Sequence, residues 1–275
     1  MIYPYGCSRM TQKKDELEFG NDNKKIIMNT IYILWLRQLK RYFRSKSRII
    51  GSLGQPLLFL VALGFGFGPI YAKAGGGNYL NFLAPGIIAM SILFTALFSG
   101  IEIIWDRQFG FLKETLVAPV SRLHIMLGRS LGGATVATFQ GIIVFLISLV
   151  AGFRPTTFAL VPLALVFVFL IALLFTALGT AIASMLQDMQ GFQLIMNFLV
   201  MPIFFLSGAL FPLMGLSKIL STVVKANPLA YGVDGLRYCF DGINSFPLST
   251  DLLVLSLVTI VLMFIGSYLF SKIEA

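Results

Sequence analysis

The chain is short of charged residues: only 12% of its 275 residues are Asp, Glu, Lys or Arg. Soluble domains carry about 25% charged residues. Hydrophobic residue types make up 57% of the chain, and they gather in several long runs. This combination excludes an ordinary soluble domain and predicts a polytopic membrane protein.

Residues that build metal sites, disulfides and catalytic groups are also scarce. The chain has two cysteines, Cys7 and Cys239, and one histidine, His124, with no cysteine or carboxylate pattern around it. We expect no metal site, and the topology below places the two cysteines on opposite sides of the membrane. No nucleophile is arranged with a base, and the phosphate-binding loop GxxxxGK(S/T) is missing. We therefore predict that the chain is not an enzyme and has no nucleotide site of its own.

The long apolar runs predict an all-α protein with six transmembrane helices, because about 20 consecutive apolar residues cross a bilayer. The runs lie at about 49–71, 80–104, 123–151, 159–185, 190–211 and 251–271. The third run has Gly133, Ala137 and Gly141 at four-residue spacing, and the fourth has a similar stripe of Ala, Thr and Ser. Such stripes let helices approach closely, so we expect bundle packing to account for them.

The basic residues set the orientation. With the N-terminus inside, the inner segments hold sixteen of the 21 Lys and Arg residues. The outer segments hold the other five: Lys73, Arg154, Lys218, Lys225 and Arg237. Cytoplasmic loops carry the excess of basic residues, so we predict that both termini are cytoplasmic. Because topology explains the net charge of +9, we expect no nucleic-acid partner.

The N-terminal part divides into two predicted segments. Residues 1–28 are polar and mixed in charge, which indicates a flexible cytoplasmic tail. Residues 29–48 predict an amphipathic helix at the membrane interface, with Trp35 on its apolar face. Its other face carries four cations directed towards anionic lipid: Arg37, Lys40, Arg41 and Arg44. The alternative is a juxtamembrane anchor without a wider role.

The polar break between the second and third runs, WDRQFGFLKETLVAPVSR, differs from the other loops. Its pattern predicts a short helix from about Asp106 to Ala118, ended by Pro119. The charged face of that helix comprises Asp106, Arg107, Gly110, Lys113 and Glu114, with Phe111 at its margin. The segment is either a solvated amphipathic loop or an element that docks a soluble partner.

The stretch from Phe211 to Thr250 is long and only weakly polar. Breaks at Pro212 and at Asn227-Pro228 predict one or two short helices that dip back into the outer leaflet. The alternative is an extracellular surface loop. Asp234 and Arg237 lie three residues apart and could pair locally.

No acidic residue lies at the midpoint of a predicted span; Glu102 lies at the inner end of the second, close to Asp106. Ion-coupled carriers usually keep ionisable groups inside the membrane, so we expect a partner to supply the energy for transport. Two alternatives stay open. A passive channel would need polar stripes along several spans, and only the fourth span offers one. A non-transporting scaffold would recruit a soluble protein through the polar break.

Three motifs in order and spacing resemble the permeases of ABC-2-type transporters, in the branch of daunorubicin-resistance and nodulation-factor exporters. The first is the polar break, through Asp106, Arg107, Gly110, Glu114, Thr115, Leu116 and Pro119. The others are LAPGIIAM at 83–90 and NPLAYGVDGLR at 227–237, the latter containing Asn227, Pro228, Tyr231, Asp234 and Arg237. The resemblance covers roughly residues 30 to 273.

This resemblance implies an ABC-2-type transmembrane domain over 49–273. It implies an elbow helix before the first span, a cytoplasmic coupling helix, and re-entrant outer helices before the last span. It further implies two permease chains in the cell membrane, with two cytoplasmic ATPase subunits that bind ATP and magnesium. Arg107 and Glu114 would contact the ATPase, Phe111 would insert into it, and Gly110 would permit close approach. The substrate would be amphipathic, such as a drug, a lipid or a glycolipid.

Overall fold

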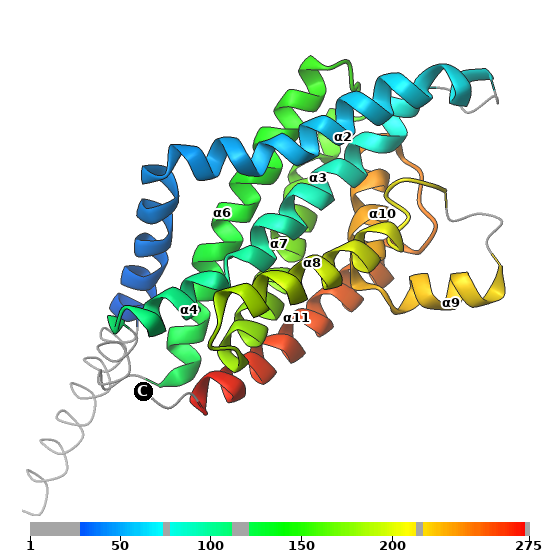
Figure 1. Cartoon of the computed structure of the whole chain (residues 1–275). Helices are drawn as coiled ribbons and strands as arrows, with labels where there is room; N and C mark the ends of the chain where they lie inside the picture. The colour runs from blue at the N-terminus through cyan, green and yellow to red at the C-terminus, as the bar shows by residue number, and fades with distance from the viewer. Residues whose placement is uncertain (1–27, 74–77, 112–120, 213–216, 273–275) are drawn as a thin grey trace, which may run out of the picture.

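The computed structural model describes residues 28–73, 78–111, 121–212 and 217–272, which form helices and connecting turns with no strand among them (Figure 1). A helix over residues 28–44 comes first. It is followed by α2 (Lys46–Lys73), α3 (Tyr79–Phe98), α4 (Ile101–Gln108), α6 (Arg122–Val150), η1 (Phe158–Leu160), α7 (Val161–Met185), α8 (Met189–Phe205), α9 (Lys218–Ala226), α10 (Pro228–Asp241) and α11 (Leu248–Ser271).

Five helical segments are long and apolar enough to cross a membrane, by length and composition. They are Lys46–Tyr71, Tyr79–Gln108, Arg122–Val150, Phe158–Met185 and Leu248–Ser271. The fifth predicted span, 190–211, differs: its helix α8 has only 17 residues. At 1.5 Å per residue, that is about 25 Å, less than the ~30 Å hydrocarbon core. The structure therefore supports a multi-pass helical protein but does not confirm the count of six.

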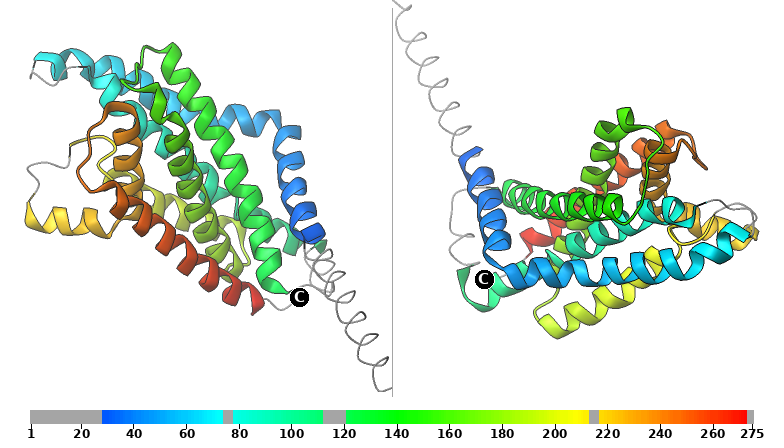
Figure 2. Two further views of the ribbon diagram at one scale, coloured as in Figure 1. Left: turned by 180° about the vertical axis from the view of Figure 1, so that it is seen from behind. Right: turned by 90° about the horizontal axis from the view of Figure 1, so that it is seen from above.

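The spans and α8 run together as one bundle, and the helix over 28–44 lies across one end of it (Figures 1 and 2). That end also holds α4, the start of α6, the α7–α8 turn and the end of α11. We call it the inner end, following the predicted orientation, and the opposite end, with α9, the outer end. The predicted helix over 29–48 is two elements, because the chain breaks at Ser45 and α2 already starts at Lys46.

Small residues set the spacing inside the bundle, as the stripes in the sequence predicted. A Cβ added to Gly133 would lie 2.7 Å from side-chain atoms of both Ser99 and Thr176. One added to Gly141 would lie 2.7 Å from the Ile92 side chain. These positions have no room for a larger side chain, so α6 packs closely on α3 and α7.

Candidate functional site

The predicted docking segment starts from α4, a short polar helix that continues α3 after a turn at Ser99 and Gly100. Glu102 lies in its first turn and Arg107 in its last, an order that complements the helix dipole. Glu102 and Asp106 are four residues apart, and both are buried. Buried carboxylates need cationic or hydrogen-bonding partners, so the surroundings of this pair decide what α4 does.

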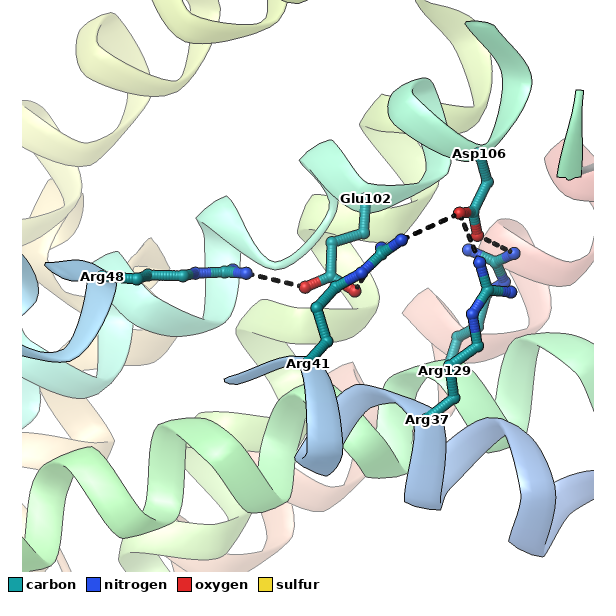
Figure 3. Close-up of polar contacts among 6 residues, drawn as sticks. All are labelled: Arg37, Arg41, Arg48, Glu102, Asp106 and Arg129. Atoms are coloured by element: carbon teal, nitrogen blue, oxygen red, sulfur yellow. Dashed lines mark hydrogen bonds and ion pairs between the residues drawn. The ribbon is translucent and has the colours of Figure 1, made fainter. Parts of the chain in front are cut away.

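Asp106 is the centre of an ion-pair network (Figure 3). Its Oδ1 accepts from Nη2 of Arg37 at 2.7 Å and from Nη2 of Arg41 at 3.5 Å. Its Oδ2 accepts from Nη2 of Arg129 on α6 at 2.7 Å. The Asp106 and Arg129 side chains are 2% and 3% exposed, so this pair is nearly free of water.

Glu102 extends the network towards α2 (Figure 3). Its Oε1 accepts from Nη1 of Arg48 at 2.8 Å, and its Oε2 accepts from Nη1 of Arg41 at 3.3 Å. We call these six residues the inner charge cluster: Arg37, Arg41, Arg48, Glu102, Asp106 and Arg129. The cluster ties α4 to the helix over 28–44, to the first turn of α2 and to α6.

The opposite side of α4 is attached to the inner turn between α7 and α8. Arg107 donates from Nη1 to the carbonyl of Leu186 at 2.9 Å and from Nη2 to that of Ser184 at 3.2 Å. Carbonyls at a helix C-terminus lack helical partners, and a basic side chain commonly supplies them. A displacement of α4 would therefore act on helices on both of its sides.

The chain changes direction directly after α4. Phe109 caps the helix and is 70% exposed, and Gly110 takes the left-handed conformation with φ 80°. Phe111 is 48% exposed, and the Arg37 guanidinium lies 5.8 Å from the centre of its ring. The predicted helix start at Asp106 is therefore wrong, because Asp106 and Arg107 belong to a helix that ends at Gln108. Glu114, Thr115, Leu116 and Pro119 lie outside the described residues.

The structure also changes the role expected for several charges. Asp106 is 1% exposed, so its carboxylate does not belong to an exposed docking face. Arg37 and Arg41 point to carboxylates of the bundle rather than to lipid, while Lys40 and Arg44 stay exposed. Helical periodicity identified one basic face, but it could not show that half of that face covers α4.

Some residues of the site were missing from the sequence-based prediction. Arg48 and Arg129 were counted only as basic residues of the inner segments, yet both bind a carboxylate of α4. The available signal was Glu102 and Asp106 at i, i+4 directly after a long apolar run, since such a pair needs several cations when it is buried. Trp35, predicted at the interface, donates from Nε1 to Oγ1 of Thr135 on α6 at 3.0 Å.

The predicted helix break in the outer region is confirmed at Asn227-Pro228. The Asn227 side chain accepts from the N–H of Leu229, and its amide donates to the carbonyl of Ile203 at 2.6 Å. Pro228 occupies the first position of α10, where a missing N–H costs nothing. Tyr231 donates to the carbonyl of Lys225 at 2.8 Å, which holds α9 against α10.

The predicted local pair between Asp234 and Arg237 is wrong. Asp234 accepts from the backbone N–H groups of Ser245 and Phe246, while Arg237 donates to the carbonyl of Gly208 at 2.9 Å. The Arg237 guanidinium also lies 4.0 Å from the centre of the Phe82 ring. Burial lowers the pKa of Arg237 to about 10, which leaves it protonated at neutral pH. Both residues thus join α10 to the outer loops.

Comparisons with known proteins place this architecture in one family. The profile of the ABC-2 type transporter family matches residues 29–240. Nodulation protein J of Rhizobium leguminosarum bv. trifolii is 29% identical over 220 residues, covering 79% of this chain and 81% of that protein. The inner membrane transport permease YadH of Escherichia coli (strain K12) is 29% identical over 225 residues, covering 81% and 87%.

A relative from Cyanophora paradoxa extends the similarity along almost the whole chain. That transport permease, ycf38, is 26% identical over 283 aligned positions, covering 97% of this chain and 94% of its own. The family match over residues 29–240 includes all six residues of the inner charge cluster and most of α10. The chain is a membrane transport permease and belongs to the ABC-2 type transporter family.

Proposed function

We propose that the chain is the membrane subunit of an ATP-driven exporter whose energy comes from a separate cytoplasmic ATPase. The observation that carries this proposal is the attachment of α4. The helix is bonded on one side to the helix over 28–44, α2 and α6, and on the other to the α7–α8 turn. A partner that moves the segment after Gly110 would therefore move several spans at once.

The ATPase would contact the segment after Gly110. Phe111 is 48% exposed at its start, and Glu114, Thr115, Leu116 and Pro119 follow it in the sequence. ATP and magnesium would bind in that partner. Arg107 would act differently from the sequence-based expectation, since its guanidinium is occupied by carbonyls of the α7–α8 turn. It would transmit the motion rather than contact the partner.

The substrate would be amphipathic: a drug, a lipid or a glycolipid-like molecule. A cavity of about 440 Å³ lies between α2, α3 and α8, next to the inner charge cluster. Its lining includes both polar and aromatic residues, namely Arg48, Ser52, Gln55, Phe94, Thr95, Phe98 and Asn197. Such a mixture suits a molecule with a polar group and an apolar body.

A second copy of the chain would complete the pathway in the cell membrane, with both termini on the cytoplasmic side. The faces of α2, α8 and α11 that point away from the bundle carry exposed apolar side chains, among them Leu58, Phe198 and Phe264. Lipid would cover most of these faces and the second chain part of them. The short helices α9 and α10 would be the re-entrant outer elements.

Site-specific photo-crosslinking tests the ATPase contact. A photo-reactive residue would replace Phe111, and one at Phe158 would serve as control, because Phe158 is 63% exposed just before α7 at the other end. We expect an ATPase subunit to be captured in native membranes from position 111 and not from position 158. Capture of a protein without nucleotide-binding ability at 111 would favour the scaffold alternative.

A charge reversal gives a functional test of the same contact. Glu114→Arg should abolish ATP-coupled transport while the chain still inserts, because it reverses a charge on the proposed docking segment. Glu114→Gln, which keeps the shape and removes only the charge, should retain part of the activity. Full transport by the Glu114→Arg variant would show that the ATPase contact lies elsewhere.

A further inference from the structure

The corner between the helix over 28–44 and α2 encloses a groove of about 970 Å³. Its lining includes five cationic residues: Arg37, Lys40, Arg41, Arg44 and Lys46. Ile33 and Leu36 add apolar surface, and no acidic residue among those described lines it. We call it the corner groove.

Among the described residues, only part of this positive charge is paired with a carboxylate. Arg37 and Arg41 bind Asp106 and Glu102, and their side chains keep 36% and 31% of their surface exposed. Lys40, Arg44 and Lys46 are exposed and form no ion pair with a described residue. The inner charge cluster behind the groove itself holds four arginines against two carboxylates. The corner therefore has an excess of positive charge that an anion would offset.

The backbone at the start of α2 adds to the positive electrostatic potential of the corner groove. Lys46 and Ser47 belong to the first turn of α2, a helix of 28 residues, and both line the groove. The N–H groups of a first turn have no helical acceptor and give that end a partial positive charge. Side-chain cations and a helix N-terminus together favour a phosphate-like anion.

The position of the groove indicates whether the anion is a lipid headgroup or free phosphate. The candidate span Lys46–Tyr71 begins at the groove, so the corner lies where a transmembrane helix leaves the apolar layer. Ile33 in the groove and Ile50 one turn along α2 are 61% and 71% exposed. A ligand with an acyl chain beside its phosphate would cover such side chains, whereas free phosphate would not.

We propose that the corner groove binds the phosphate of an anionic membrane lipid through Lys40, Arg44 and Lys46, with the acyl chain beside Ile33. The binding does not depend on the ATPase proposed above. Arg37 lines the groove, binds Asp106 and lies over the ring of Phe111. A lipid in the groove would therefore stabilise the contacts between the helix over 28–44 and the end of α4, where the proposed docking segment begins.

Native mass spectrometry of the full-length chain tests this site, with phosphatidylglycerol as anionic probe and phosphatidylcholine as zwitterionic probe. The test variant is K40A/R44A/K46A, which removes three exposed cations and no described ion pair. The matched control, K73A/K218A/K225A, removes three exposed lysines at the outer end. We expect roughly 100-fold weaker phosphatidylglycerol binding in the test variant, from the attraction of three surface cations, and wild-type binding in the control.

The unfolding temperature of each variant, measured without added lipid, shows whether the fold is intact. Equal phosphatidylglycerol binding by the folded test variant and the control would overturn the proposal. Equal retention of the two lipids by the wild type would also overturn it, because charge would then play no part. A third arm adds inorganic phosphate: displacement of the lipid by an equal concentration of phosphate would identify a general anion site and contradict the lipid assignment.

Discussion

The helix α2 and the segment formed by α3 and α4 both qualify as membrane spans, yet they differ in how much of their surface is buried within the chain. In the most apolar window of α2, 17% of the residues are buried within the chain, whereas in that of α3–α4 the share is 83%. α2 lies at the edge of the bundle and α3 inside it (Figure 2). Apolar composition thus identified both candidate spans but could not tell a helix at the edge of the bundle from a central one.

The difference follows from what each helix packs against. α3 is covered by α2, α6, α7 and α10, and small residues such as Gly86 let neighbours approach its backbone. α2 makes most of its contacts with α3 alone and leaves Leu58, Phe65 and Ile70 exposed. The same type of substitution should therefore have opposite consequences in the two segments.

The largest effect is expected for the charge at the end of the buried segment. Asp106→Asn leaves Arg129, 3% exposed, without a carboxylate partner. Loss of one member of a buried ion pair costs about 3–5 kcal/mol, so the free energy of unfolding should fall by that amount. Unfolding of the purified chain in mild detergent measures the loss.

Glu102→Gln supplies the comparison within α4. Glu102 is buried, but the arginines that bind it are each 31% exposed, so water can solvate them once the carboxylate is removed. The loss should therefore approach the value for pairs at the surface, about 1 kcal/mol or less. The Gln variant should therefore unfold at nearly the wild-type midpoint. If both variants lost the same stability, burial of the arginine partner would not be what distinguishes the two carboxylates.

A smaller effect is expected from a methyl group at a close approach of two backbones. A Cβ at Gly179 on α7 would contact the carbonyl oxygen of Leu97 on α3. Overpacking of this kind costs about 1–3 kcal/mol, so Gly179→Ala should be destabilising. On α2, a Cβ at Gly66 meets nothing within 4 Å, and Gly66→Ala should be neutral or stabilise by up to about 1 kcal/mol. Thermal unfolding of both variants, side by side, tests whether the two segments differ in packing as described.

Features that depend on local sequence could be predicted. The long apolar runs located the helices α2, α3, α6, α7 and α11. The Asn227-Pro228 step located the start of α10, because Asn caps helices and Pro fits their first position. The stripe containing Gly133 and Gly141 indicated close packing, which the structure confirms. Each of these signals lies in the same short stretch of sequence as the helix, or the face of a helix, that it specifies.

Features that join distant parts of the chain could not be predicted in the same way. Arg129 meets Asp106 across 23 positions, and Arg37 meets it across 69. Periodicity assigned Arg37 to a polar face, but both lipid headgroups and a buried carboxylate are suitable partners for that face. The count of six spans is not confirmed for a related reason, since the apolar run at 190–211 continues past the end of α8 at Phe205 into a turn.

The smallest effect is expected at Gly110, in the turn that follows the buried segment. Its φ of 80° is unfavourable for a residue with a Cβ, and Ala there costs about 1–2 kcal/mol. The bundle does not depend on this turn, so Gly110→Ala should leave the global unfolding midpoint close to that of the wild type. Local opening should increase, and amide exchange at 105–111 should accelerate about five-fold or more.

Gly152→Ala is the matched control, because Gly152 also has a positive φ, 111°, and lies between α6 and η1 at the outer end. It should strain its own turn and leave exchange at 105–111 unchanged. Unchanged exchange in the Gly110→Ala variant would mean that the turn tolerates a side chain. A Cβ at Gly110 meets no described atom within 4 Å. The reason for a glycine at this position would then be the close approach of a partner protein.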